Sequence, residues 1–135
     1  MGAWDIGVYD DDTAYEAIDE LKTATSILSV MEKYFDDVNN AEYIGYDEGN
    51  YALVAAAVID SVTNNTTYRC DNDDYSLWIE SLKTIDFSSV IAKAIKAVDA
   101  ITGENSELKE LWQDNEKLFN SWLEDKQSIK KRLVK

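Results

Sequence analysis

The chain has 135 residues, of which 45% are hydrophobic, and its 27 acidic against 13 basic side chains give a formal net charge of -14 at pH 7. This length fits one domain, since two would each fall near the lower size limit for a stable core. The hydrophobic fraction exceeds that of a disordered acidic tail, so we expect one folded domain over residues 1–135.

Several classes of protein are excluded by what the chain lacks. It has no histidine and one cysteine, Cys70, which excludes Ser-His-Asp and Cys-His catalysis and removes the commonest zinc ligand. A lone cysteine forms no internal disulfide, as is typical of a reducing compartment. The sequence has no signal peptide and no run of ~20 apolar residues, so we expect a cytoplasmic protein without membrane contact.

The N-terminal eleven residues are predicted to be irregular or briefly extended, with Trp4 as an apolar anchor beside Gly7. A helix is expected to begin near Asp12 or Thr13, where Thr13-Ala-Tyr-Glu16 has the pattern of a capping box. Its apolar spacing continues to Phe35, with a break or kink predicted within residues 23–26.

The second predicted helix starts after Asp47, which is a good N-cap residue. Its apolar residues follow helical spacing and its other sides carry alanines, so we expect it to pack centrally. The stripe consists of Tyr51, Val54, Ala55, Val58, Ile59 and Val62.

Three further helices are predicted towards the C-terminus. One covers about residues 75–83, with Leu77, Trp78 and Leu82 facing inward, and the next runs from Asp86 to a stop at Thr102-Gly103. The last is capped by Asn105 or Ser106, carries Trp112 and Trp122 towards the core, and is interrupted near residues 114–115. The fold predicted is therefore all-α, a compact bundle of about five helices after a short irregular N-terminal segment.

No motif for catalysis, a cofactor or a metal emerges. Residues 71–75 resemble the start of a calcium loop, but an EF-hand needs Gly at 76 and Glu at 82, where this chain has Ser76 and Leu82. No glycine falls in a phosphate-loop spacing. The Asp10–Asp12 triplet is explained by helix capping and by charge at the positive helix end.

The acidic residues themselves are the remaining candidate. Residues 1–50 hold 13 acidic and 2 basic side chains, a charge of -11, whereas residues 106–135 hold 6 and 7, a charge of +1. Such a field either solubilises the protein or docks a basic partner, and it repels nucleic acid. The residues expected on a docking face are Asp10, Asp11, Asp12, Asp36, Asp37, Asp47 and Glu48.

The opening Met-Gly-Ala-Trp-Asp-Ile-Gly-Val-Tyr-Asp resembles the start of an uncharacterised bacterial family, domain-of-unknown-function family 4259. Residues 47–62 and 94–112 resemble its central helix and closing segment, although Asp5, Tyr9 and Asp11 depart from the usual residues. The resemblance implies a bacterial helical domain and no reaction. It marks Trp4, Gly7, Asp10 and Asp12 as signature positions, of which we interpret Trp4 and Gly7 as structural.

Three functions follow as hypotheses. The first is a non-enzymatic acidic protein that binds a basic protein, for example an immunity-type inhibitor of a basic toxin or nuclease. The second is a metal-dependent enzyme using Asp10, Asp12 and a distant acid such as Asp47. The third is a structural or oligomerising module; the sequence indicates neither the oligomeric state nor a cofactor.

Overall fold

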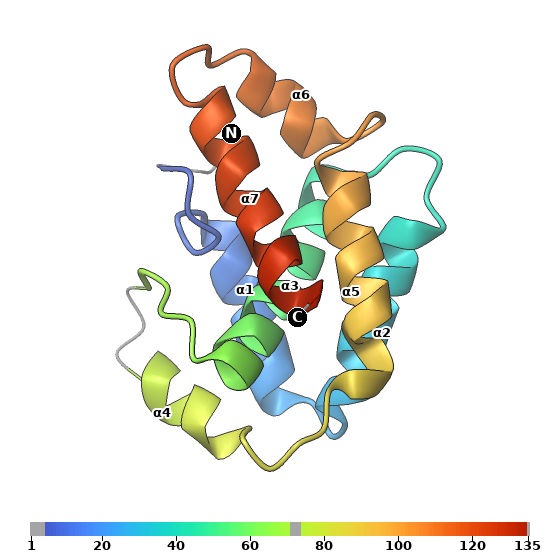
Figure 1. Ribbon diagram of the computed structural model, residues 1–135. Coiled ribbons are helices and arrows are strands. Elements are labelled where there is room, and N and C mark those ends of the chain that lie inside the picture. The colour runs from blue at the N-terminus through green and yellow to red at the C-terminus, as the bar shows by residue number, and fades with distance from the viewer. Residues whose placement is uncertain (1–4, 71–73, 135) are drawn as a thin grey trace.

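The computed structural model describes residues 5–70 and 74–134, and the ordered structure of these residues is helical (Figure 1). Trp4 lies outside the described residues. The helices are α1 (Asp12–Thr23), α2 (Ile27–Asn39), α3 (Tyr46–Asn64), α4 (Tyr75–Ser81), α5 (Ser88–Ile101), α6 (Glu107–Gln113) and α7 (Phe119–Val134).

Helix α3 is the centre of the bundle, as its sequence predicts. All the other helices contact it, and every residue from Ala52 to Val62 is buried. A helix that is buried on all sides must be apolar nearly all round, and four of these residues are alanines, which leave room for neighbours on each side. Two polar residues in this buried stretch, Asp60 and Ser61, are the exceptions that the rest of the fold must satisfy.

The structure confirms the all-α bundle and corrects the number of helices in the described part of the chain to seven. The first predicted helix corresponds to two helices, α1 and α2. The chain breaks between them because Ala24 is extended and the Ser26 side chain caps a new helix by accepting a hydrogen bond from Ser29 N. The last predicted helix is also two, since α6 ends at Gln113 and α7 begins at Phe119. Both breaks fall where the sequence predicts an interruption.

Two helix starts differ from the prediction. The cap of α1 is Asp11, whose carboxylate accepts from Thr13 N at 2.9 Å, so the predicted Thr13–Glu16 capping box is wrong. Helix α3 is preceded by Gly45, which places Asp47 and Glu48 inside its first turn. Acidic side chains are favourable there because the N-terminal end of a helix carries partial positive charge.

The orientation predicted for α4 is wrong at Leu77, which is 74% exposed. Tyr75 and Ile79, four residues apart on one face, are the buried residues of this short helix, together with Leu82 just beyond its end. Trp78 is half-buried, and the Lys22 ammonium lies 5.7 Å from its ring centroid.

Trp112 and Trp122 are both buried, as predicted, but they lie on separate helices. The break between α6 and α7 folds the chain back, so that the two rings stack with centroids 6.3 Å apart. The other end of α6 is tied to the start of α3, where Ile44 N donates to Asn105 O at 2.8 Å and Glu107 N donates to Ile44 O at 3.0 Å.

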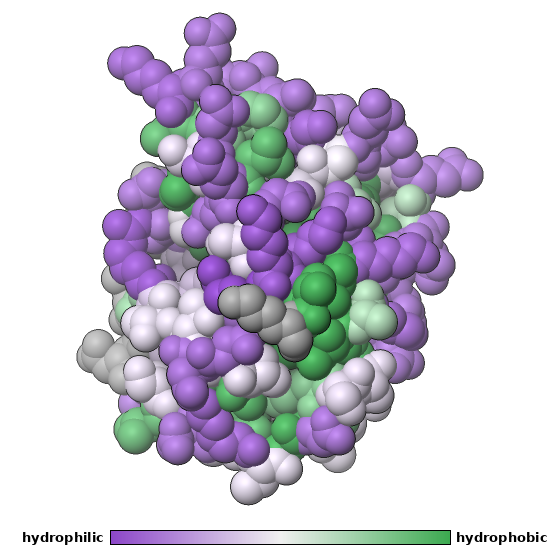
Figure 2. Space-filling view, in the orientation of Figure 1, coloured by the Kyte–Doolittle hydropathy of each residue, from purple (hydrophilic) through white to green (hydrophobic). Residues whose placement is uncertain are grey.

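The face that carries α7 is mostly hydrophilic, with an apolar strip beside the C-terminal end of that helix and next to α5 (Figure 2). Val134, at this end of α7, is 63% exposed. Among the helices of the described residues, none is both long and apolar enough to cross a membrane.

Candidate functional site

The predicted Asp10–Asp12 triplet separates into three environments. Asp10 is buried and binds Arg69, and Asp11 is buried where its carboxylate accepts from Tyr46 OH and Asn50 of α3. Asp12 is exposed in the first turn of α1. Asp10 and Asp11 therefore do not belong to an exposed docking face, because the fold uses both carboxylates internally.

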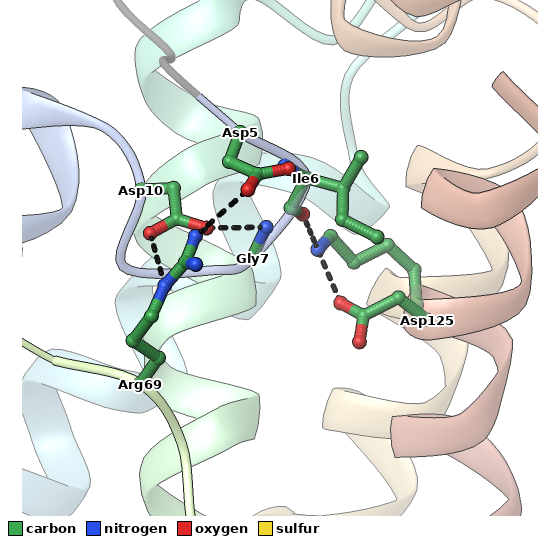
Figure 3. A network of polar contacts seen from close by, with 7 residues as sticks. Asp5, Ile6, Gly7, Asp10, Arg69 and Asp125 are labelled. Atoms are coloured by element: carbon green, nitrogen blue, oxygen red, sulfur yellow. Dashed lines mark hydrogen bonds and ion pairs between the residues drawn. The ribbon is translucent and has the colours of Figure 1, made fainter. Parts of the chain in front are cut away.

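Asp10 closes a turn of the N-terminal segment, which comes from one side of the site while Arg69 comes from another (Figure 3). Its carboxylate accepts from Gly7 N at 2.9 Å and from Arg69, whose guanidinium also reaches Asp5 at 3.0 Å. These hydrogen bonds raise the pKa of Arg69. Gly7 is needed for a close approach, since a Cβ there would lie 2.6 Å from the Asp10 carboxylate.

Lys126 of α7 is buried and binds the same N-terminal segment from inside the fold. Its ammonium donates to Ile6 O and to the Asp125 carboxylate, each at 2.6 Å, and its side chain is 2% exposed. Burial lowers the pKa of Lys126, while Asp125 opposes that shift. The charge is thus enclosed, and its two hydrogen bonds fix the N-terminal turn against α7.

Asp60 is the most deeply buried carboxylate of the described residues, with no exposed surface, and three of these residues donate hydrogen bonds to it. Arg132 Nε donates to it at 2.8 Å, Tyr68 OH at 2.5 Å and Asn64 Nδ2 at 2.8 Å. Burial and the hydrogen bond to Asp60 raise the pKa of Tyr68, so its hydroxyl remains a neutral donor. This network joins α3, the segment after it and α7.

These internal networks bear on the metal hypothesis. Among the described residues, no three histidine, cysteine or carboxylate side chains converge in a way that could hold a metal ion. The predicted set of Asp10, Asp12 and Asp47 is therefore not brought together, because Asp10 binds Arg69 inside the fold while Asp12 and Asp47 are exposed.

A second region gathers acids that, apart from Asp37, have no lysine or arginine partner among the described residues. Two adjoining hollows, of about 180 and 570 Å³, share Asp37 and Glu48 in their linings. We call the two hollows together the acidic groove. Its acidic lining residues come from α1, α2, the start of α3 and α6, and they are Glu20, Asp37, Asp47, Glu48 and Glu107.

Tyrosines give the acidic groove its shape. The rings of Tyr34 and Tyr51 lie 5.2 Å apart by their centroids, and Tyr43 is 49% exposed at the other end. Tyr34 OH donates to Glu20 at 2.6 Å, while Tyr43 OH donates to Glu110 at 2.7 Å. This last bond raises the pKa of Tyr43 to about 12. Tyr34 is only 3% exposed, so the rings that a cation can reach beside the carboxylates are those of the half-buried Tyr51 and the exposed Tyr43.

Positive charge is scarce in the acidic groove. Among the described residues that line it, Lys33 is the one cation, and it pairs with Asp37 at 2.9 Å. Both members of this pair are well exposed, so the pair contributes little to stability. The other four carboxylates of the lining form no ion pair with a lysine or arginine there. They leave a negative field over a concave surface.

The groove contains three of the seven residues predicted for a docking face, Asp37, Asp47 and Glu48. Asp36 lies on α2 too, but it pairs with Lys93 of α5 at 2.9 Å and lines neither hollow. The tyrosines, Glu20 and Glu107 were not identified from the sequence. Tyr43 and Glu110 are 67 residues apart, and no local spacing signals such a pair.

A family model described as a domain of unknown function, DUF4259, matches residues 2–125 of the chain. Among curated proteins and solved structures, no match to the chain was found.

Proposed function

The chain belongs to the DUF4259 family, and since that description assigns no activity, we propose from the acidic groove that the protein is a non-enzymatic binding protein for a basic protein. The segment of the partner that enters the groove carries lysine or arginine side chains. An immunity-type inhibitor of a basic toxin or nuclease is one protein of this kind.

The observation that carries this proposal is the excess of five carboxylates over one ammonium in a concave surface floored by tyrosines. Complementary charge raises the rate of encounter and orients the partner. Tyrosine is enriched among the residues that dominate binding energy, and an arginine or lysine side chain stacks favourably on its ring. The groove therefore offers both long-range attraction and short-range contacts to a cationic segment.

The arrangement of charges also supports binding in preference to catalysis. The buried carboxylates Asp10, Asp11 and Asp60 are each hydrogen-bonded by the protein's own donors, which leaves none of them for a reacting group. The carboxylates of the groove are exposed, apart from the half-buried Glu107, and are therefore open to contact with a partner.

The experiment that tests the proposal begins with a photo-crosslinking residue at position 51, inside the groove, and the same residue at position 124, on exposed α7 as a control. Cross-linking in the native cell should join a basic protein to the position-51 variant and not to the position-124 variant. That partner, purified, is then used in equilibrium binding measurements.

Charge-matched variants decide whether the groove is the site. The groove variant Asp37→Asn/Asp47→Asn/Glu48→Gln and the control variant Glu104→Gln/Glu116→Gln/Glu124→Gln each remove three negative charges from exposed positions. We expect the groove variant to bind the partner at least tenfold more weakly, a loss of about 1.4 kcal/mol, and the control variant to bind like the wild type. Equal weakening by both variants would reduce the effect to net charge and reject the groove.

A further inference from the structure

A chain of three buried hydroxyl groups leads to a separate hollow at the C-terminal end of α3. Tyr9 OH lies 2.7 Å from Tyr75 OH, which lies 3.2 Å from Ser61 Oγ. All three side chains are buried. Ser61 and Tyr75 also line a hollow of about 150 Å³ between α3, residues 65–68 and α4, whereas Tyr9 does not.

The three hydroxyl groups have one more O–H donor than they have hydrogen bonds between them. Each hydroxyl carries one proton, so three protons meet two oxygen–oxygen contacts, and one O–H group has no acceptor among the described residues. A serine in a helix often resolves this by donating to the carbonyl four residues earlier, as Thr63 does to Ile59 O at 2.8 Å. Ser61 makes no such bond in the described part of the chain.

The O–H group that lacks an acceptor belongs to Ser61 or Tyr75, which line the hollow. If it lay on Tyr9, a hydroxyl would be enclosed without an acceptor, since Tyr9 is 1% exposed and packed against the rings of Tyr68 and Tyr75. On Ser61 or Tyr75, the proton reaches the hollow. Burial raises the pKa of Tyr75 to about 12, so this hydroxyl keeps its proton over the physiological range. An oxygen atom in the hollow, from water or from a ligand hydroxyl group, would therefore satisfy this donor.

The charges around the hollow narrow the class of ligand. Lys83 lines it, held by hydrogen bonds to Val62 O at 2.9 Å and to the Asn65 side chain, and Glu80 lines it with the opposite charge. These two charges cancel, while the protein as a whole carries -14, which disfavours an anion. A neutral ligand fits this setting better than a carboxylate or a phosphate.

The remaining lining residues fit a compound with several hydroxyl groups. Hydroxyl and amide side chains supply donors and acceptors, and Ile79 and the ring of Tyr68 supply apolar surface. The hollow is smaller than the roughly 300–1,000 Å³ typical of sites for drug-sized ligands. We propose that this hollow, which shares no lining residue with the acidic groove, binds a small neutral polyol of about monosaccharide size through the Ser61–Tyr75 hydroxyl pair.

The proposal is tested by titrating the full chain with D-glucose and glycerol, and with acetate as the anionic comparison, while recording backbone amide NMR shifts. We expect saturable shifts for D-glucose or glycerol centred on Ser61, Ser76 and Ile79, and weaker or no binding of acetate. Ser61→Ala and Tyr75→Phe each remove one hydroxyl of the pair, and at least one of them should weaken binding about two- to tenfold. Thr63→Ala is the matched control, because its hydroxyl is satisfied within α3.

Three results would overturn the proposal. These are the absence of saturable shifts with both polyols, acetate binding as tightly as the better polyol, and binding that neither Ser61→Ala nor Tyr75→Phe weakens more than Thr63→Ala does. Melting temperatures of the variants separate a loss of binding from a loss of folding. The groove variant Asp37→Asn/Asp47→Asn/Glu48→Gln should bind the polyol normally, so this test and that of the acidic groove succeed or fail separately.

Discussion

The two acidic regions of this molecule treat their carboxylates in opposite ways. In the first region, Asp10 and Asp60 are buried, and each is held by an arginine far away in the sequence and by neutral donors close to it in the sequence. In the second region, the acidic groove leaves Glu20, Asp47, Glu48 and Glu107 without a cation in its lining. The first arrangement is a structural use of charge, because removal of the arginine would leave an enclosed carboxylate without its counter-charge.

Under the proposed function, a chain with a net charge of -14 divides its acidic residues between stabilising the fold and binding a partner. Three cations of α7 bind other groups of the same protein: Arg132 binds Asp60, Lys126 binds Asp125 and the Ile6 carbonyl, and Lys130 binds Asp99 at the surface. These cations do not reach the acidic groove, so its field remains available to a partner. Stability measurements should therefore respond strongly to the internal charges and weakly to those of the groove.

The largest effect is expected for Asp60→Ala. This change removes a fully buried carboxylate from Arg132, Tyr68 and Asn64, and should lower the free energy of unfolding by about 3 kcal/mol. Urea denaturation measures it. Asp99→Ala is the matched control, since Asp99 also pairs with a cation of α7 but is 61% exposed, and it should change the stability by less than ~0.5 kcal/mol. Similar values for the two variants would remove the distinction between buried and exposed charge.

Gly7→Ala should have the next largest effect. Its new Cβ would lie 2.6 Å from the Asp10 carboxylate, which is fixed by Gly7 N and Arg69, so the ion pair must shift. We expect a loss of about 1–2 kcal/mol in urea denaturation. In the double variant Gly7→Ala/Asp10→Ala the clash is absent, and the alanine at position 7 should then cost much less than it does beside Asp10. An equal cost in both backgrounds would show that Asp10 is not the cause.

A smaller effect is expected at alkaline pH from Tyr34, on the floor of the acidic groove. Burial and the hydrogen bond to Glu20 raise its pKa in the folded protein above the unfolded value of 10.0. The unfolded chain therefore releases this proton first, and the stabilisation that is present below pH 10 is lost as the pH rises above it. Between pH 9 and 11 the wild type should lose about 1 kcal/mol more than Tyr34→Phe does. Parallel pH profiles for the two proteins would contradict this assignment.

The smallest effect is expected for Asp37→Asn. Its pair with Lys33 is exposed, so the free energy of unfolding should change by less than ~0.5 kcal/mol in urea denaturation, even though binding of the partner weakens. A loss of ~2 kcal/mol or more would show that Asp37 stabilises the fold, and it would remove Asp37 from the groove residues proposed to bind the partner.

The parts of the fold that depend on local sequence were predictable. The apolar stripe of α3 identified the central helix, and Thr102-Gly103 and Ser106 marked the end of one helix and the start of another. The orientation of α4 was not predictable, because a helix of seven residues has too few positions for its period to select one face. The two helix breaks were visible only as weak propensity.

The sites were less predictable, since they are assembled from distant residues. Asp60 and Arg132 are 72 positions apart, and the sequence around Asp60 offers no sign that an arginine will reach it. Asp37, Asp47 and Glu48 were predicted as docking residues from their charge, but Glu20, Glu107 and the tyrosines join them only through the packing of α1, α2, α3 and α6. Asp10 and Asp11 were indistinguishable from exposed acids by sequence, because capping and burial depend on where α3 and Arg69 lie.

On this proposal, the groove carboxylates bind a partner while the buried carboxylates stabilise the fold. The most direct test of this division is the rate at which the purified partner, identified by cross-linking, associates with the protein, measured by stopped flow over a range of ionic strength. The wild type and the Glu104→Gln/Glu116→Gln/Glu124→Gln control should show the same steep fall of the rate with salt. The Asp37→Asn/Asp47→Asn/Glu48→Gln variant should associate at least tenfold more slowly at low salt and with a much flatter dependence. Identical salt profiles for the groove variant and the control would contradict the acidic groove as the binding site.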